Sequence, residues 1–233
     1  MTADLARIQS LLADESPLTW VFTGDSITHG LVHTQGARAY VEHLHELIRG
    51  DLARVQDAVI NTAISGWRIV QLLDDFDRRV ATWRPQIVTL MVGTNDCFTG
   101  GIFPIIEPDA FAASITAFVT KVREIGAIPV LMTQPAIDVA NAPERARIAD
   151  FAQAIRDVAA TEQTVLVDQF ARFAEHGVDE RGGVAWGLLN DPFHPGAAGH
   201  ALLALEYART VGLQPPAETN RVLVDLAARV ATA

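Results

Sequence analysis

The sequence predicts one α/β domain: a three-layer sandwich with a flavodoxin-like, five-stranded parallel sheet and helices on both faces. Two patterns support this fold class. Five short apolar runs alternate with longer segments in which apolar residues recur at helical spacing. The runs are apolar almost without interruption, which is typical of strands buried on both faces and therefore of parallel sheets. A length of 233 residues fits a single domain over residues 1–233, with enough chain to bury a core.

The apolar runs predict five strands, each of which ends at a glycine or a polar residue. The third strand has the strongest signal, since it contains the sequence Ile-Val-Thr-Leu-Met-Val. In such a sheet, ligands bind beyond the carboxyl ends of the strands. In chain order the strands cover residues 20–23, 58–61, 86–92, 128–133 and 164–167.

Helices are predicted around and between the strands, where apolar residues recur three and four positions apart. Gly126 ends the helix that begins near Phe111. Pro195 is expected to be the first residue of the helix over residues 195–208, because proline in the first turn of a helix loses no hydrogen bond. In chain order the helices cover residues 1–16, 40–48, 67–80, 111–125, 148–158, 195–208 and 223–230.

Composition and charge argue against several classes of partner. A net charge of −10 without a basic cluster disfavours binding to nucleic acid or to an anionic membrane surface. The single cysteine, Cys97, cannot form an internal disulfide, which fits a reducing compartment. No signal peptide and no run of membrane-spanning length is expected. We therefore expect a cytoplasmic protein with a small-molecule partner; whether it forms a homo-oligomer stays open.

Three short motifs could supply the parts of a serine-hydrolase site. Gly24-Asp25-Ser26 follows the first strand, Gly93-Thr94-Asn95-Asp96 follows the third, and Asp191-Pro192-Phe193-His194 lies before the helix at 195–208. Acyl transfer at neutral pH needs a nucleophile, a donor to the developing oxyanion and an oriented base. The three motifs contain residue types for each of these roles.

Each motif also has a purely structural interpretation. Asp25 or Ser26 would cap a following helical turn, and Asn95 would suit a turn. The histidine motif distinguishes better between a catalytic and a structural role. Only one of the seven histidines, His194, has an aspartate, Asp191, three residues before it. In a loop, that carboxylate can hold the imidazole Nδ1–H and direct Nε2 toward Ser26.

Together with Asn61–Gly66 after the second strand, these motifs resemble the four sequence blocks of the SGNH (GDSL-type) hydrolase superfamily, in the family's order. The blocks span most of the chain. Two positions depart from the family's pattern: Ile27 replaces a leucine, and Ala63 stands where many members have glycine. Neither departure removes a residue to which the family assigns a catalytic role.

The resemblance implies a role for each motif. Ser26 would be the nucleophile, His194 the general base and Asp191 the residue that orients the base. The oxyanion hole would consist of the backbone N–H groups of Ser26 and Gly66 and the side-chain amide of Asn95. No metal or other cofactor is implied.

We therefore predict a serine-dependent carboxylic ester hydrolase, of the acetylesterase type, that acts through an acyl-enzyme on small or short-acyl esters. The apolar segment 98–106 could line the acyl pocket or simply pack. His29 and His33 are expected at the surface or at the rim of the site, and Trp186 in packing. Five residues near the motifs are candidates for contact with the substrate: Trp67, Arg68, Phe98, Gln134 and Phe193.

Two alternatives stay open. An acyltransferase would use the same serine but pass the acyl group to an alcohol or amine. A non-catalytic binding module on a flavodoxin-like sheet is the alternative from another class. The absence of G-x-G-x-x-G and Walker A patterns argues against a phosphate-bearing ligand for such a module.

Overall fold

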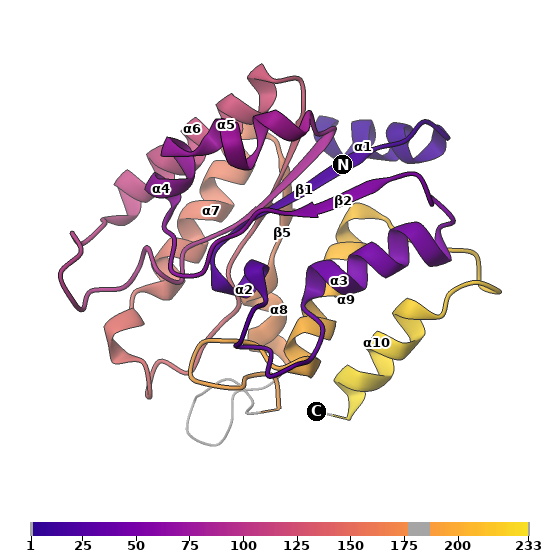
Figure 1. Ribbon diagram of the computed structural model, residues 1–233. Helices are drawn as coiled ribbons and strands as arrows, with labels where there is room; N and C mark the ends of the chain where they lie inside the picture. The colour runs from indigo at the N-terminus through magenta and orange to yellow at the C-terminus, as the bar shows by residue number, and fades with distance from the viewer. Residues whose placement is uncertain (1, 177–186, 233) are drawn as a thin grey trace.

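The computed structural model describes residues 2–176 and 187–232, which places Trp186 outside the described residues. Its central layer is a five-stranded parallel sheet in the order β2-β1-β3-β4-β5 (Figure 1). This is the flavodoxin-like order, so the predicted fold class is confirmed. The strands are β1 (Thr19–Gly24), β2 (Ala58–Asn61), β3 (Ile87–Met91), β4 (Ile128–Met132) and β5 (Val165–Val167).

Helices cover both faces of the sheet (Figure 1). Each face has its own apolar cluster. None of the described helices is both long and apolar enough to span a lipid bilayer. One face packs against α1 (Ala3–Ala13), α3 (Tyr40–Glu46), α8 (Gln169–Glu175), α9 (Ala197–Val211) and α10 (Val222–Ala231). The other packs against α4 (Ile69–Asp74), α5 (Phe76–Arg79), α6 (Pro108–Glu124) and α7 (Ile148–Glu162).

The helix predicted over residues 67–80 is instead two short helices, α4 and α5. The break falls at Asp75, whose backbone angles (φ −106°, ψ 21°) are not helical. The Asp75 carboxylate accepts hydrogen bonds from the guanidinium groups of Arg78 and Arg79 in the next turn. Ion pairs three and four residues apart support the helix that follows, α5, while the low helix propensity of aspartate fits the break at this position.

The helix predicted to open at Pro195 begins two residues later, at Ala197, with Gly196 as its N-cap. Pro195 forms an isolated antiparallel bridge with Leu189, and the Gly196 N–H donates to the Leu188 carbonyl. These contacts close the loop that contains the histidine motif. Proline therefore ends a loop here and does not start the helix.

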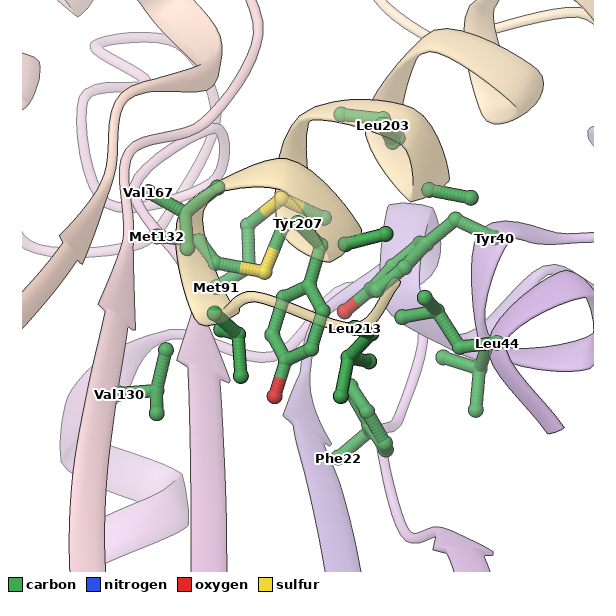
Figure 2. Close-up of a cluster of buried hydrophobic side chains, with 14 of the residues drawn as sticks. Phe22, Tyr40, Leu44, Met91, Val130, Met132, Val167, Leu203, Tyr207 and Leu213 are labelled. Atoms are coloured by element: carbon green, nitrogen blue, oxygen red, sulfur yellow. The ribbon is translucent and has the colours of Figure 1, made fainter. Parts of the chain in front are cut away.

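The core beneath the motifs includes two buried tyrosines, Tyr40 and Tyr207 (Figure 2). The Tyr207 hydroxyl lies 2.9 Å from Oγ1 of Thr89, and the Tyr40 hydroxyl lies 3.1 Å from Oγ1 of Thr28. Burial raises the pKa of both phenols, so both stay neutral. Thr28 lies in α2 (Ser26–His29), so the second bond ties the turn with the predicted nucleophile to the core.

The end of β1 requires a glycine. Gly24 has a φ of +153°, and a Cβ built there would lie 2.1 Å from the carbonyl oxygen of Met91 in β3. No other residue fits without moving a strand. The close approach lets the chain leave the sheet and enter α2 directly, which sets the position of Ser26 at the carboxyl edge.

We predict that Gly24→Ala lowers the free energy of unfolding by about 3 kcal/mol or more, because the new methyl group collides with backbone. Urea denaturation of the two proteins measures the difference. Gly50→Ala is the matched control, since a Cβ at Gly50 meets no atom within 4 Å and its φ is not positive. The control should change stability by less than about 1 kcal/mol; equal losses in both variants would contradict the steric argument.

Candidate active site

Three side chains from distant parts of the chain form one hydrogen-bonded series. Ser26 is the first residue of α2, and its Oγ lies 2.9 Å from Nε2 of His194. Nδ1 of His194 lies 2.6 Å from Oδ2 of Asp191. In this arrangement the imidazole can take the hydroxyl proton at one nitrogen while the carboxylate holds the proton at the other.

The loop before α9 holds Asp191 in place through its own backbone. Oδ1 of Asp191 accepts hydrogen bonds from the N–H groups of Phe193 (3.0 Å) and His194 (2.8 Å). The carbonyl of Pro192 accepts the N–H of Asp138, which anchors the tip of the loop. Because one carboxylate oxygen is fixed by backbone, the other stays directed at the imidazole.

The electrostatics keep the base unprotonated and its partner ionised near pH 7. Burial lowers the pKa of His194 below its ordinary value of 6.5 and outweighs the hydrogen bond and charge of Asp191, which act to raise it. Partial burial acts to raise the pKa of Asp191. The hydrogen bonds from Phe193 and His194 outweigh that burial, so the net shift is downward. The pair is thus a neutral imidazole beside a carboxylate, as a general base requires.

The three predicted oxyanion donors follow, along the chain, the carboxyl ends of β1, β2 and β3. The N–H of Ser26 opens α2 and so has no acceptor within the helix. The Asn95 amide donates one hydrogen bond to the Trp67 carbonyl at 3.1 Å, which leaves its second N–H. Gly66 has a φ of +82°, and a Cβ there would meet no protein atom within 4 Å. The protein itself therefore requires glycine for the backbone conformation and not for space.

A cavity of about 180 Å³ adjoins Gly66 and Asn95. Two of the predicted substrate contacts, Arg68 and Phe98, line it. A larger hollow of about 720 Å³ lies between α1 and residues 52–57 and contains none of the motif residues, so size alone would not locate the site. The residues that line the smaller cavity are Gly66, Arg68, Gln71, Asn95, Phe98, Phe103 and Arg145.

Arg145 belongs to this cavity although nothing in the sequence pointed to it. Its guanidinium lies 3.9 Å from the ring centre of Phe193 and 4.6 Å from that of Phe98. The Phe193 ring in turn lies 4.4 Å from the His194 ring. Phe193, a predicted substrate contact, therefore lies between the base and this arginine.

Three of the five predicted contacts, Trp67, Gln134 and Phe193, do not line the cavity. Gln134 is fully buried, and its amide donates to the Ile148 carbonyl at 2.9 Å. The Gln134 side chain lies directly against Gly93, where a Cβ would come within 2.7 Å of Oε1. The Trp67 ring packs under the guanidinium of Arg79, at 5.0 Å. We therefore drop Gln134 and the Trp67 ring from the set of substrate contacts.

His33 was expected at the rim, but it stacks on the predicted base. The ring centres of His33 and His194 are 3.5 Å apart with 13° between the planes, and Nδ1 of His33 is 3.9 Å from Oδ2 of Asp191. Of the described residues, these three form the one group with donor atoms close enough for a metal ion. The in-plane lone pairs of two nearly parallel rings do not converge on one point, so the arrangement suits stacking better than coordination.

Two buried carboxyl groups, Asp25 and Asp96, support the loops of the site. Oδ1 of Asp25 caps α2 by accepting the Ile27 N–H at 3.0 Å, and Oδ1 of Asp96 accepts the Ile69 N–H at 2.9 Å. The structural interpretation of Asp25 is therefore right and compatible with a chemical role for Ser26. Burial, with a contribution from Asp96, raises the pKa of Asp25 to about 7, and burial raises the pKa of Asp96 to about 6.

We predict that Asp25→Asn stabilises the protein at about pH 8 relative to about pH 4.5. The unfolded carboxyl ionises near 3.8 and the folded one near 7, so folding binds a proton and wild-type stability falls as pH rises between these values. The variant lacks this cost but keeps an oxygen for the Ile27 N–H. Urea denaturation at both pH values should show a relative gain of up to about 3 kcal/mol; no pH-dependent difference would contradict the raised pKa.

The chain is similar in sequence and in fold to known proteins. The model of the GDSL-like lipase/acylhydrolase family matches residues 22–202. An acetylxylan esterase from Geobacillus stearothermophilus is 25% identical over 209 residues, which cover 83% of this chain and 94% of the relative. The crystal structure of Axe2, an acetylxylan esterase from that organism, has a TM-score of 0.72 at 23% identity and covers 85% of this chain and 96% of its own. That of LAE5, an α/β hydrolase from the metagenome of Lake Arreo, Spain, has a TM-score of 0.71 at 21% identity, with coverages of 85% and 98%.

Proposed function

We propose that Ser26 is the nucleophile, His194 the general base and Asp191 its orienting carboxylate. The premise is the family: the chain belongs to the GDSL-like lipase/acylhydrolase family and is a serine ester hydrolase. One observation carries the assignment: the 2.9 Å contact between Ser26 Oγ and His194 Nε2, across 168 positions of sequence. Crystal structures named as catalytic mutants of Axe2 replace a serine, a histidine and an aspartate in that enzyme, which supports the same set of residue types here.

The proposed reaction has two steps. His194 takes the Ser26 proton while Oγ attacks the ester carbonyl carbon, and the new oxyanion accepts hydrogen bonds from the N–H groups of Ser26 and Gly66 and the amide of Asn95. The C–O bond to the alcohol then breaks, and the imidazolium returns its proton to the leaving oxygen. His194 deprotonates a water that attacks the acyl-enzyme. The C–O bond to Ser26 Oγ then breaks, the imidazolium returns its proton to Oγ, and the acid and free serine are released.

We propose short acyl groups, acetyl first, as the substrates. The cavity next to Gly66 and Asn95 has a volume of about 180 Å³ and is bounded by the rings of Phe98 and Phe103. Arg68 donates to the Pro104 carbonyl at 2.6 Å, which braces this segment. Of the two interpretations of segment 98–106, these contacts favour an acyl pocket. The relative from Geobacillus is named for acetylxylan, so acetylated xylo-oligosaccharides are the natural first polymer-derived substrates to test.

A series of 4-nitrophenyl esters tests both parts of the proposal. Wild type should turn over the acetyl ester at least about tenfold faster, in kcat/KM, than the octanoyl ester, because the longer chain exceeds the cavity. Ser26→Ala should lower kcat by about 10³-fold or more on every ester. Ester cleavage is followed by absorbance, with circular dichroism to verify folding.

Ser65→Ala is the matched control for this series. Ser65 Oγ also lies 3.1 Å from an imidazole nitrogen, that of His29, but the pair is exposed. This variant should keep wild-type rates. Activity that survives Ser26→Ala and disappears in Ser65→Ala would move the nucleophile to Ser65.

We predict that kcat/KM falls as pH decreases with a midpoint below 6.5. Only neutral His194 can accept the serine proton, so activity is lost as pH falls through its pKa, which burial lowers. The sequence alone predicts a midpoint near the reference pKa of histidine, about 6.5. The structure predicts a lower midpoint, because His194 is buried. Rates with the acetyl ester from about pH 4.5 to 8 provide the profile; a midpoint above 6.5 would contradict a buried imidazole as the base.

A further inference from the structure

We propose that His33 is a positioning residue for ester hydrolysis: its ring holds the imidazole of His194 in line with Ser26 and offers a π face to the imidazolium formed in the transition state. The inference rests on the proposed function, since it needs His194 as the base. Neither the family model nor the relatives' names assign a role to this position. Three independent features of the molecule support it.

The first feature is the contact itself. The rings of His33 and His194 are 3.5 Å apart and within 13° of parallel, which is closer and flatter than most aromatic pairs in proteins. The Phe193 ring also lies close to His194, at 4.4 Å and 46°. The base is thus confined by two rings, so rotation of its plane away from the Ser26 hydroxyl requires one of them to move.

The second feature is the turn that presents His33. The N–H of His33 donates to the Leu31 carbonyl at 2.7 Å across Val32, which has a φ of +65°. This three-residue turn is strained, above all for a β-branched residue. Strain of this kind persists where surrounding contacts impose it, and such places cluster at functional sites.

The third feature joins the two loops. The side-chain amide of Asn190 donates to the His33 carbonyl at 2.9 Å. Asn190 directly precedes Asp191, so the segment that carries the base and its carboxylate also fixes the backbone of the stacking residue. The backbone of His33 is therefore fixed by Asn190, and its ring is fixed by the stack on His194. Two contacts with the same segment hold His33 in this position.

Several charged groups near the stacked rings affect the pKa of His194. Asp191 and Arg145 act on His194, and His33 is also near His29. A neutral His33 ring stabilises a cation stacked on it, as other aromatic faces do. A protonated His33 would repel the imidazolium, and its charge is one of the groups that lower the pKa of His194.

Two substitutions separate the ring from its charge. His33→Ala removes both and should lower kcat on the acetyl ester about tenfold, the equivalent of one good aromatic or cation–π contact. His33→Phe keeps a flat ring and should restore kcat to within about threefold of wild type. The charge of His33 lowers the pKa of His194, so the acid limb of kcat/KM should move to higher pH in His33→Phe, which keeps the ring without that charge.

The controls distinguish a failed inference from a failed mechanism. His45→Ala changes an exposed histidine on α3 and should match wild type in kcat and pH profile. If His33→Ala behaves like wild type while Ser26→Ala is inactive, the inference is overturned and the proposed nucleophile stands. If Ser26→Ala stays active, the proposed function itself fails.

Two further outcomes bear on the stacking argument. Equal losses of kcat in His33→Phe and His33→Ala, both folded by circular dichroism, would show that the ring does not matter and would overturn the inference. If His33→Ala does not fold, Asn190→Ala leaves the ring present but frees its backbone. It should then give a smaller loss of kcat, about threefold, with a midpoint near that of wild type; an unchanged kcat in Asn190→Ala would overturn the inference.

Discussion

The hydrogen bond between Ser26 and His194 is the interaction on which the site depends, because it joins two loops 168 positions apart. A contact of this kind adds little stability of its own. It exists because each partner is fixed independently. Ser26 is fixed by the end of β1, where the backbone of Gly24 packs directly against the backbone of Met91. His194 is fixed by a loop closed through the bridge between Leu189 and Pro195.

The fold supports this contact through polar bonds that run from the core to the carboxyl edge of the sheet. Tyr40 in α3 bonds to Thr28 in α2, and the side-chain amide of Asn61 at the end of β2 donates to the Thr28 carbonyl at 2.7 Å. The turn that begins with Ser26 is therefore held on two sides, by the buried phenol of Tyr40 and by the Asn61 amide at the end of β2. The rigidity of the sheet is thereby transmitted to a four-residue helix that would not be stable alone.

The site also carries features that cost stability. Asp25 and Asp96 are buried carboxyl groups, each with one oxygen that has no hydrogen-bond partner among the described residues, and Val32 has an unfavourable backbone conformation. All three lie in loops at the carboxyl edge and not in the sheet. The two apolar clusters on the faces of the sheet offset these costs, so an ordered core supports a strained and polar edge.

The sequence by itself determined the strands, their parallel arrangement and the residue types of a serine hydrolase. These signals are local: an apolar run such as residues 86–92, or an aspartate three residues before His194, can be read without knowing the fold. Tertiary structure decided the rest. The stack of His33 on His194 and the placement of Arg145 against Phe193 join segments far apart in the chain, and no spacing in the sequence reports such contacts. Gln134 directly follows a predicted strand and is therefore a candidate for the site. In the structure its side chain is completely buried and lies against Gly93.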